Sequence, residues 1–101
     1  MDEKDKPLKI RKWDVVEYLQ SEEEQQLYLE ACIEEAGDDA AFIAKVLGDI
    51  ARARGMTQLA NDTGLARESL YKALSGENNP SFGTILKVIH ALGMKLTVSH
   101  V

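Results

Sequence analysis

Four side chains between Arg67 and Leu74 have the chemistry needed to contact a base edge or a phosphate. If this segment is helical, Arg67, Glu68, Ser69 and Lys72 occupy its outward positions. An arginine donates two hydrogen bonds to guanine, and a lysine donates to guanine or to a phosphate. Glu68 either accepts from the amino group of cytosine or is simply favourable in a first helical turn. The segment is therefore predicted to read duplex DNA, and we call it the reading helix.

Small and apolar residues around this segment predict two short helices that cross closely. Ala60 is the small residue that the first helix needs, and Gly64 tolerates the positive φ of a tight turn. Leu70 and Ala73 are the apolar anchors of the second helix. This spacing matches the helix-turn-helix pattern, in which the second helix enters the major groove. An ordinary helical hairpin is the alternative.

Residues that flank the reading helix are candidates for phosphate contacts. The start of the first short helix, where Thr57 is the expected cap, offers free amides and a hydroxyl to an anion. The loop after the reading helix precedes another helix N-terminus, where Ser81 is first of all a cap. Tyr71 either stacks on the sugar–phosphate backbone or packs against the neighbouring helix. The candidates are Thr57, Gln58, Tyr71, Asn78, Asn79 and Ser81, and each also has a local structural explanation.

Capping residues and apolar periodicity predict the other helices. Ser21 has capping-box spacing to Glu24, and Gly37 is expected to end that helix. Asp38-Asp39 and Ser81 are expected to cap two further helices with apolar residues at helical spacing. The faces predicted to be buried hold Leu27, Tyr28, Ala31 and Cys32 in the first helix, Phe42, Ile43, Val46, Leu47 and Ile50 in the second, and Phe82, Ile85, Leu86, Ile89 and Leu92 in the last.

The predicted fold is all-α. It consists of a five-helix, repressor-like helix-turn-helix domain over residues 21–93, preceded by a basic arm and short helix over residues 1–20. Alternation of apolar and polar residues over Met94–Val98 predicts a strand within a dimerisation segment, residues 94–101. A lone strand leaves its backbone groups unpaired. It is therefore expected to pair with its copy in a homodimer, or alternatively with Leu8–Trp13 of the same chain.

Composition indicates one globular domain of 101 residues, with 45% hydrophobic and 29% charged residues. No apolar run approaches the roughly 20 residues that cross a bilayer, and the charged N-terminus lacks a signal-type apolar core. Cys32 is the single cysteine and is interpreted as a small buried apolar residue. A cytoplasmic protein with no membrane segment is expected.

The distribution of charge is uneven. The net charge is −5, although nucleic-acid-binding proteins usually carry basic patches. Residues 14–50 hold eleven acidic residues and one basic residue, whereas residues 1–13 and 51–101 are each net positive. This asymmetry indicates two functional surfaces of opposite sign. The acidic surface is expected to bind a basic partner protein, with a solvated helix face as the alternative.

Five motifs between Glu34 and Phe82 resemble one known family. They are Glu34–Asp39, Leu47–Ala60, Gly64-Leu65, Arg67–Gly76 and Asn79–Phe82, and Lys9–Leu19 resembles the family's leader. The family is that of the addiction module antidote proteins, which are HigA-like antitoxins of type II toxin–antitoxin modules with a repressor-type (XRE/Cro/cI-like) helix-turn-helix. The resemblance implies a homodimer that binds operator DNA and represses its own operon. It also implies neutralisation of a basic RelE/HigB-like toxin, a ribosome-dependent mRNA endonuclease.

Two departures and one competing function accompany this resemblance. Ala66 stands where a serine or threonine would cap the reading helix better, and Asn61-Asp62 places no positive charge on the first short helix. A stand-alone phage-repressor-type transcriptional regulator without a toxin is the alternative function. An enzyme is not expected, because His90 and His100 share no metal-ligand spacing with each other or with Cys32. No cofactor and no metal are predicted.

Overall fold

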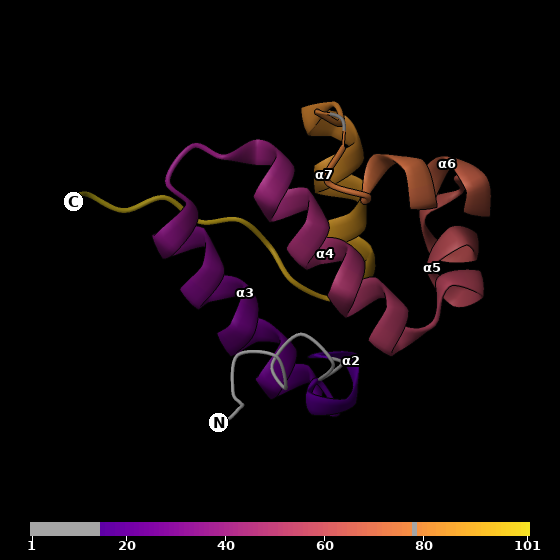
Figure 1. Cartoon of the computed structure of the whole chain (residues 1–101), viewed down its shortest axis with the longest axis horizontal. Helices are drawn as coiled ribbons and strands as arrows, with labels where there is room; N and C mark the ends of the chain where they lie inside the picture. Colours follow the sequence, from indigo (N-terminus) through magenta and orange to yellow (C-terminus); the bar gives the residue numbers. More distant parts are fainter. Residues whose placement is uncertain (1–14, 78) are drawn as a thin grey trace, which may run out of the picture.

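The computed structural model in Figure 1 describes residues 15–77 and 79–101. These ranges contain helices and no strand, which confirms the all-α prediction. The predicted pairing partner Leu8–Trp13 lies outside the described residues. No helix of the described part is both long and apolar enough to cross a membrane. The helices are α2 (Val15–Tyr18), α3 (Glu22–Ala36), α4 (Ala40–Arg54), α5 (Met56–Thr63), α6 (Arg67–Ala73) and α7 (Phe82–Ala91).

Helix α4 is the central element of the fold. It packs against α2, α3, α5 and α7, and Figure 1 shows α3 on one side of it and the α5–α7 group on the other. Burial of a large apolar side chain stabilises a fold by about 1.5–3 kcal/mol, so the apolar face of α4 is what holds the two sides together. Its buried residues are Ala44, Val46, Leu47, Ile50 and Ala51.

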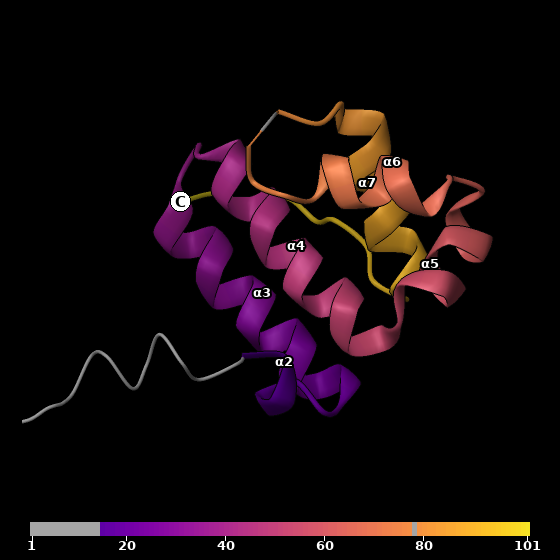
Figure 2. The same ribbon diagram turned by 45° about the vertical axis from the view of Figure 1, so that its right-hand side comes forward.

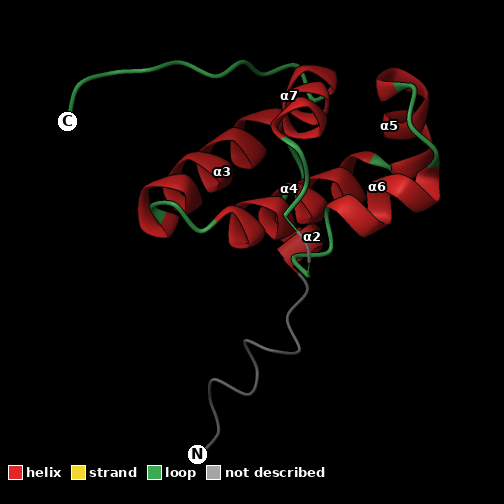
Figure 3. Ribbon diagram, turned by 90° about the horizontal axis from the view of Figure 1, so that it is seen from above, coloured by secondary structure: helices red, strands yellow, loops and turns green. Residues whose placement is uncertain are grey.

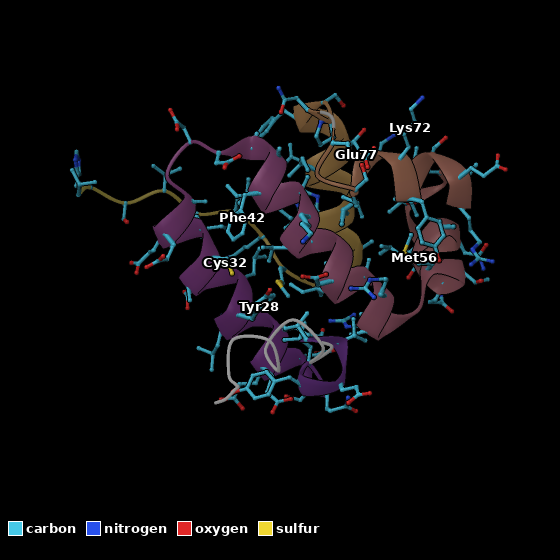
Figure 4. All side chains as sticks on the ribbon, viewed as in Figure 1. Tyr28, Cys32, Phe42, Met56, Lys72 and Glu77 are labelled. Carbon is cyan, nitrogen blue, oxygen red and sulfur yellow. The ribbon has the colours of Figure 1, made fainter. Side chains whose placement is uncertain are left out.

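The predicted buried face of α3 is partly wrong. Leu27 is 57% exposed and Ala31 is also exposed, while Leu29 and the polar Gln25 are buried. Tyr28 and Cys32 do face α4, as Figure 4 shows, but both are half-buried. A prediction from apolar residues alone misplaces the buried face of α3, because it treats Gln25 as exposed.

Gln25 can be buried because both ends of its side-chain amide have partners. Its Nε2 donates to the Leu19 carbonyl over 3.2 Å, and its Oε1 accepts from Arg54 Nε over 2.7 Å. Arg54 Nη2 in turn donates to the Leu92 carbonyl, which follows α7, over 2.8 Å. The same nitrogen lies 3.6 Å from the Glu22 carboxylate. Arg54, on α4, therefore connects α3, the residue after α2 and the end of α7.

Two aromatic residues at helix starts are exposed, although they were predicted to be buried. Phe42 is 40% exposed in the first turn of α4, and Phe82 is 67% exposed as the first residue of α7. The apolar pattern of each helix starts before the part of the helix that neighbouring helices cover. Phe42 and Phe82 therefore lie outside the hydrophobic core.

The expected C-terminal strand is not formed. Residues 94–101 have no regular secondary structure, and Figure 3 shows this tail as a loop that leaves α7 and extends along the molecule. Met94 packs against the core and its amide donates to the Ile89 carbonyl over 3.1 Å. Beyond it every residue is exposed. A strand needs a hydrogen-bonding partner, and the described part of the chain offers no strand for the tail to pair with.

Gly48 allows α4 to approach the end of α6. A methyl group at this position would lie 2.5 Å from the Leu74 carbonyl oxygen and 3.3 Å from the Leu74 Cβ. We expect Gly48→Ala to lower the free energy of unfolding by about 1–3 kcal/mol, the usual cost of overpacking. Chemical denaturation measures this change.

Gly83→Ala is the matched control, because Gly83 also lies in a helix but its methyl group would meet only Ser81 Oγ, at 3.8 Å. This variant should be at least as stable as the wild type, since alanine favours helix more than glycine by about 1 kcal/mol. If Gly48→Ala were equally stable, the position of α6 would not depend on the glycine.

Candidate nucleic-acid interface

A glycine and a threonine hold the tight turn between α5 and α6. Gly64 has a φ of 76°, a left-handed conformation that glycine adopts without a steric penalty. Its amide donates to the Ala60 carbonyl over 2.9 Å. The Thr63 hydroxyl donates to the Leu59 carbonyl over 2.9 Å and accepts from the Leu65 amide over 3.2 Å. The predicted glycine turn is thus present, and Thr63 adds hydrogen bonds that the sequence pattern did not predict.

Helix α6 turns its apolar residues inward and its charged residues outward. Leu70 and Leu74 are buried and Ala73 is half-buried, which anchors the helix on the core. Glu68 and Lys72, four residues apart, lie on the opposite side, and Figure 4 shows Lys72 projecting away from the body of the protein. The predicted outward residues Arg67, Glu68, Ser69 and Lys72 are all exposed.

Tyr71 makes its contacts within α6. The guanidinium carbon of Arg67 lies 5.7 Å from the centre of the Tyr71 ring, and Arg67 Nη2 lies 3.4 Å from the Tyr71 hydroxyl oxygen. The Tyr71 side also borders a hollow of about 240 Å³ between α4 and α6. Neither predicted role of Tyr71, packing against the neighbouring helix or stacking on the sugar–phosphate backbone, included this pairing with Arg67. Stacking on the backbone would occur only in a complex with DNA.

The helices α5 and α6 lack the side-chain caps that the longer helices have. Ser21, Asp39 and Ser81 each accept a hydrogen bond from a backbone amide in the first turn of α3, α4 and α7. The N-caps of α5 and α6, Gly55 and Ala66, provide no such bond. The first-turn amides of these two short helices are therefore without a side-chain acceptor, which is the condition for binding an anion.

Thr57 does not cap α5 as expected. The helix begins at Met56 and its N-cap is Gly55, two residues before the expected cap, and the Met56 side chain is buried in the core. Thr57 therefore lies exposed in the first turn. Gln58 beside it is exposed too, and its Nε2 donates to Asp62 Oδ1 over 2.9 Å.

The remaining candidates follow α6 in the loop that Figure 2 shows running from the end of α6 to the start of α7. Asn79 is exposed, and Asn78 lies outside the described residues. Ser81 is confirmed as a cap, because its Oγ accepts from the Thr84 amide over 3.1 Å. The structure thus gathers Arg67, Glu68, Ser69, Tyr71 and Lys72 on one short helix, with the other described candidates on the elements before and after it.

The acidic residues lie on another part of the molecule. Helix α3 contains six glutamates and no basic residue. Glu23, Glu30 and Glu34 are exposed around the exposed Leu27. Figure 1 shows α4 between this helix and the α5–α6 pair. The negative charge of α3 is therefore kept away from Arg67 and Lys72, whose nearest acidic neighbour in the chain is Glu68 on the same helix.

Burial affects two titratable side chains between α3 and α4. It raises the pKa of Tyr28 to about 12, with a further contribution from the negative charge of Asp49. The Tyr28 hydroxyl donates to Asp49 Oδ2 over 3.3 Å, and Asp49 Oδ1 accepts from Arg52 over 2.8 Å. Burial also raises the pKa of the Cys32 thiol, against a hydrogen bond with Tyr28 that lowers it. A protonated thiol is a weak nucleophile. In residues 15–77 and 79–101, no three His, Cys, Asp or Glu side chains are grouped to hold a metal ion.

Comparison with known proteins places the chain in a family. Residues 9–100 match the family described as "Probable addiction module antidote protein". The chain belongs to this antidote family. An antidote counteracts a toxin, so membership supports an antitoxin role and implies a toxin partner of some kind.

A relative of similar length exists in Haemophilus influenzae. It is 52% identical over 89 residues, which cover 88% of this chain and 90% of the relative. It is described only as an uncharacterized protein. No solved structure matches the chain.

The sequence analysis of this member of the family predicted neither the pairing of Arg67 with Tyr71 nor the approach of Gly48 to Leu74. The i, i+4 spacing of Arg67 and Tyr71 is a signal from which their pairing could have been found. The close approach of Gly48 to Leu74 has no such signal, because the two residues lie on different elements and are far apart in the chain.

Proposed function

We propose that this protein is a HigA-like antitoxin of a type II toxin–antitoxin module, which binds operator DNA as an autorepressor and neutralises a basic RelE/HigB-like toxin. In this proposal α5 and α6 form a repressor-type (XRE/Cro/cI-like) helix-turn-helix. The observation that carries it is the exposure of Arg67 and Lys72 on a short helix that the buried Leu70 anchors. The antidote family supports the antitoxin part.

The DNA-binding part of the proposal rests on how the candidate residues are distributed. Arg67 and Lys72 supply donors for guanine and phosphate, and Glu68 lies between them as a possible acceptor for cytosine. The uncapped first turn of α5, with Thr57 and Gln58, faces solvent and suits one phosphate. The loop with Asn79, and the start of α7 at Ser81, suit another. These are contacts to backbone and to bases, as specific binding requires.

Substitution of Arg67 tests the base-reading role. We expect Arg67→Ala to remove the preference for the operator over an operator with the guanine replaced, because a bidentate arginine–guanine pair contributes about 1–3 kcal/mol of discrimination. Lys72→Ala should weaken binding to all sequences and reduce the salt slope by about 1. Fluorescence anisotropy with the DNA upstream of the operon measures both effects.

Lys87→Ala is the control, because Lys87 is exposed on α7 and is not among the DNA-binding candidates. Thermal unfolding should be nearly unchanged in all three variants, since the side chains are exposed. Full operator discrimination by Arg67→Ala would show that α6 does not read the guanine through this residue.

We propose a homodimer in which the tail pairs with its copy. Leu96 and Val98 are exposed apolar residues that alternate with polar ones, and their backbone groups have no strand partner in the described chain. Pairing of two tails would bury these side chains and would satisfy the backbone. It would also place two copies of α6 for half-sites one DNA turn apart, about 34 Å.

Deletion of residues 94–101 should convert the dimer to a monomer, as measured by sedimentation velocity. Lys95→Ala, an exposed polar position in the same tail, is the control and should leave the dimer intact. A truncated protein that still sediments as a dimer would place the interface elsewhere.

The acidic face of α3 is the proposed surface for the toxin. An RNA-cleaving toxin needs basic residues for its substrate, and opposite charges speed association. The face cannot lie against DNA, because its glutamates would repel phosphates. Binding a toxin there would leave α6 free, so that one protein could hold DNA and toxin together. The alternative, a phage-repressor-type regulator, needs no toxin and gives this face no partner.

Charge reversal on α3 tests the toxin surface. We expect the triple variant Glu23→Lys, Glu30→Lys, Glu34→Lys to lose co-purification with the basic protein of the adjacent reading frame, and high salt to weaken the wild-type complex. Each single reversal can be compared with Glu77→Lys, an exposed glutamate outside α3. If the triple variant still neutralises the toxin, the acidic residues serve solubility only. If the wild type itself forms no complex, the stand-alone regulator is favoured.

We also propose that the protein acts in the cytoplasm by binding rather than by catalysis. The half-buried Cys32 thiol, whose pKa burial raises, is consistent with a packing role for this residue.

A further inference from the structure

Helix α6 has three kinds of side-chain environment. Leu70 and Leu74 face the core, and Glu68 and Lys72 face outward. With 100° of rotation per residue, Arg67 and Tyr71 fall together on the flank between these two sides. The Tyr71 flank is the one next to α4, because Tyr71 borders the hollow that residues of α4 also line. The Arg67 side chain therefore lies beside an aromatic ring on the flank of α6, and not at the centre of the outward face of the helix.

Arg67 and Tyr71 make two contacts with each other, one through the ring and one through the hydroxyl, and the same side-chain conformations allow both. The guanidinium lies over the ring at 5.7 Å, within the range of a cation–π contact. The same group places Nη2 at 3.4 Å from the hydroxyl, a long hydrogen bond. The ring is 48% exposed and has open space beside it in the 240 Å³ hollow. Close packing on α4 alone therefore does not hold the ring, and its contact with Arg67 contributes to its position.

This arrangement leaves the arginine able to bind a base. A guanidinium has five N–H donors, of which Tyr71 accepts one, and a bidentate contact with guanine uses two. An unpaired arginine samples many rotamers and must lose that freedom on binding. An arginine already held over a ring loses less, and preorganisation of this kind raises affinity for the correct site.

We propose that Tyr71 is a positioning residue that holds Arg67 in the orientation from which it reads guanine. The proposal rests on the DNA-binding function proposed for α6, and it gives Tyr71 no contact of its own with a base. Tyr71 then contributes to sequence discrimination only through Arg67.

A double-mutant cycle on operator binding tests this dependence. Tyr71→Leu should reduce discrimination between the operator and the guanine-substituted operator by roughly 2- to 5-fold, the size of an exposed cation–π contact. In the Arg67→Ala background the same substitution should have no further effect on discrimination. Tyr71→Phe keeps the ring and should retain most of it. An equal loss from Tyr71→Leu in both backgrounds would overturn the proposal and assign Tyr71 a direct contact with DNA.

The free protein provides a second test that does not depend on DNA. In NMR spectra the side-chain protons of Arg67 should show a ring-current shift that Tyr71→Leu removes and Tyr71→Phe preserves. Arg67 shifts that are identical in the wild type and in Tyr71→Leu would refute the positioning role even if operator binding is confirmed. A wild-type protein with the ring-current shift but no preference for operator DNA would instead refute the proposed function of α6, and with it the positioning role.

Discussion

The arrangement of the helices depends on the apolar face of α4 and on the partly buried hydrogen bonds that Arg54 makes at its end. A guanidinium that leaves water needs partners for its donors, and here they come from Gln25 on α3, from the Leu92 carbonyl and from Glu22. Glu22 and Gln25 both lie in the first half of α3, and Leu92 follows the end of α7. Loss of the arginine would leave the Gln25 amide oxygen buried without its donor, at a cost of about 1–3 kcal/mol. Arg54 thus adds polar contacts that join the acidic helix and the end of α7 to α4, beside the apolar packing of these helices.

This arrangement separates the glutamates of α3 from the exposed Arg67 and Lys72 in a chain with a net charge of −5. Helix α4 lies between α3 and the α5–α6 pair, so the glutamates of α3 and the exposed Arg67 and Lys72 occupy separate surfaces (Figure 1). Salt screens charges over about 8–10 Å, and separation by a helix is of this order. The sign of the net charge is therefore a poor guide to what an individual face of this protein can bind.

The features that the sequence predicts well are those that neighbouring residues determine. Ser21 and Ser81 cap helices because the acceptor and the amide are three residues apart, and Gly64 forms its turn by its own φ. Predictions fail where distant groups decide. Gln25 is buried because Arg54, 29 positions along the chain, satisfies it. The tail alternates like a strand, but its secondary structure depends on a partner, which alternation cannot supply. For the candidate site, the exposed residues of α6 follow from periodicity, whereas their ligand does not.

The missing side-chain caps of α5 and α6 have a consequence for turnover of the protein. Helix ends without acceptors open more readily, and segments of low local stability are the ones that proteases reach first. A phosphate group on these amides would supply the absent acceptor and close the ends. Occupied and free molecules would then differ in lifetime as well as in location. Under the proposed function, the free protein would be replaced faster than the protein on DNA, so its supply would depend on continued synthesis.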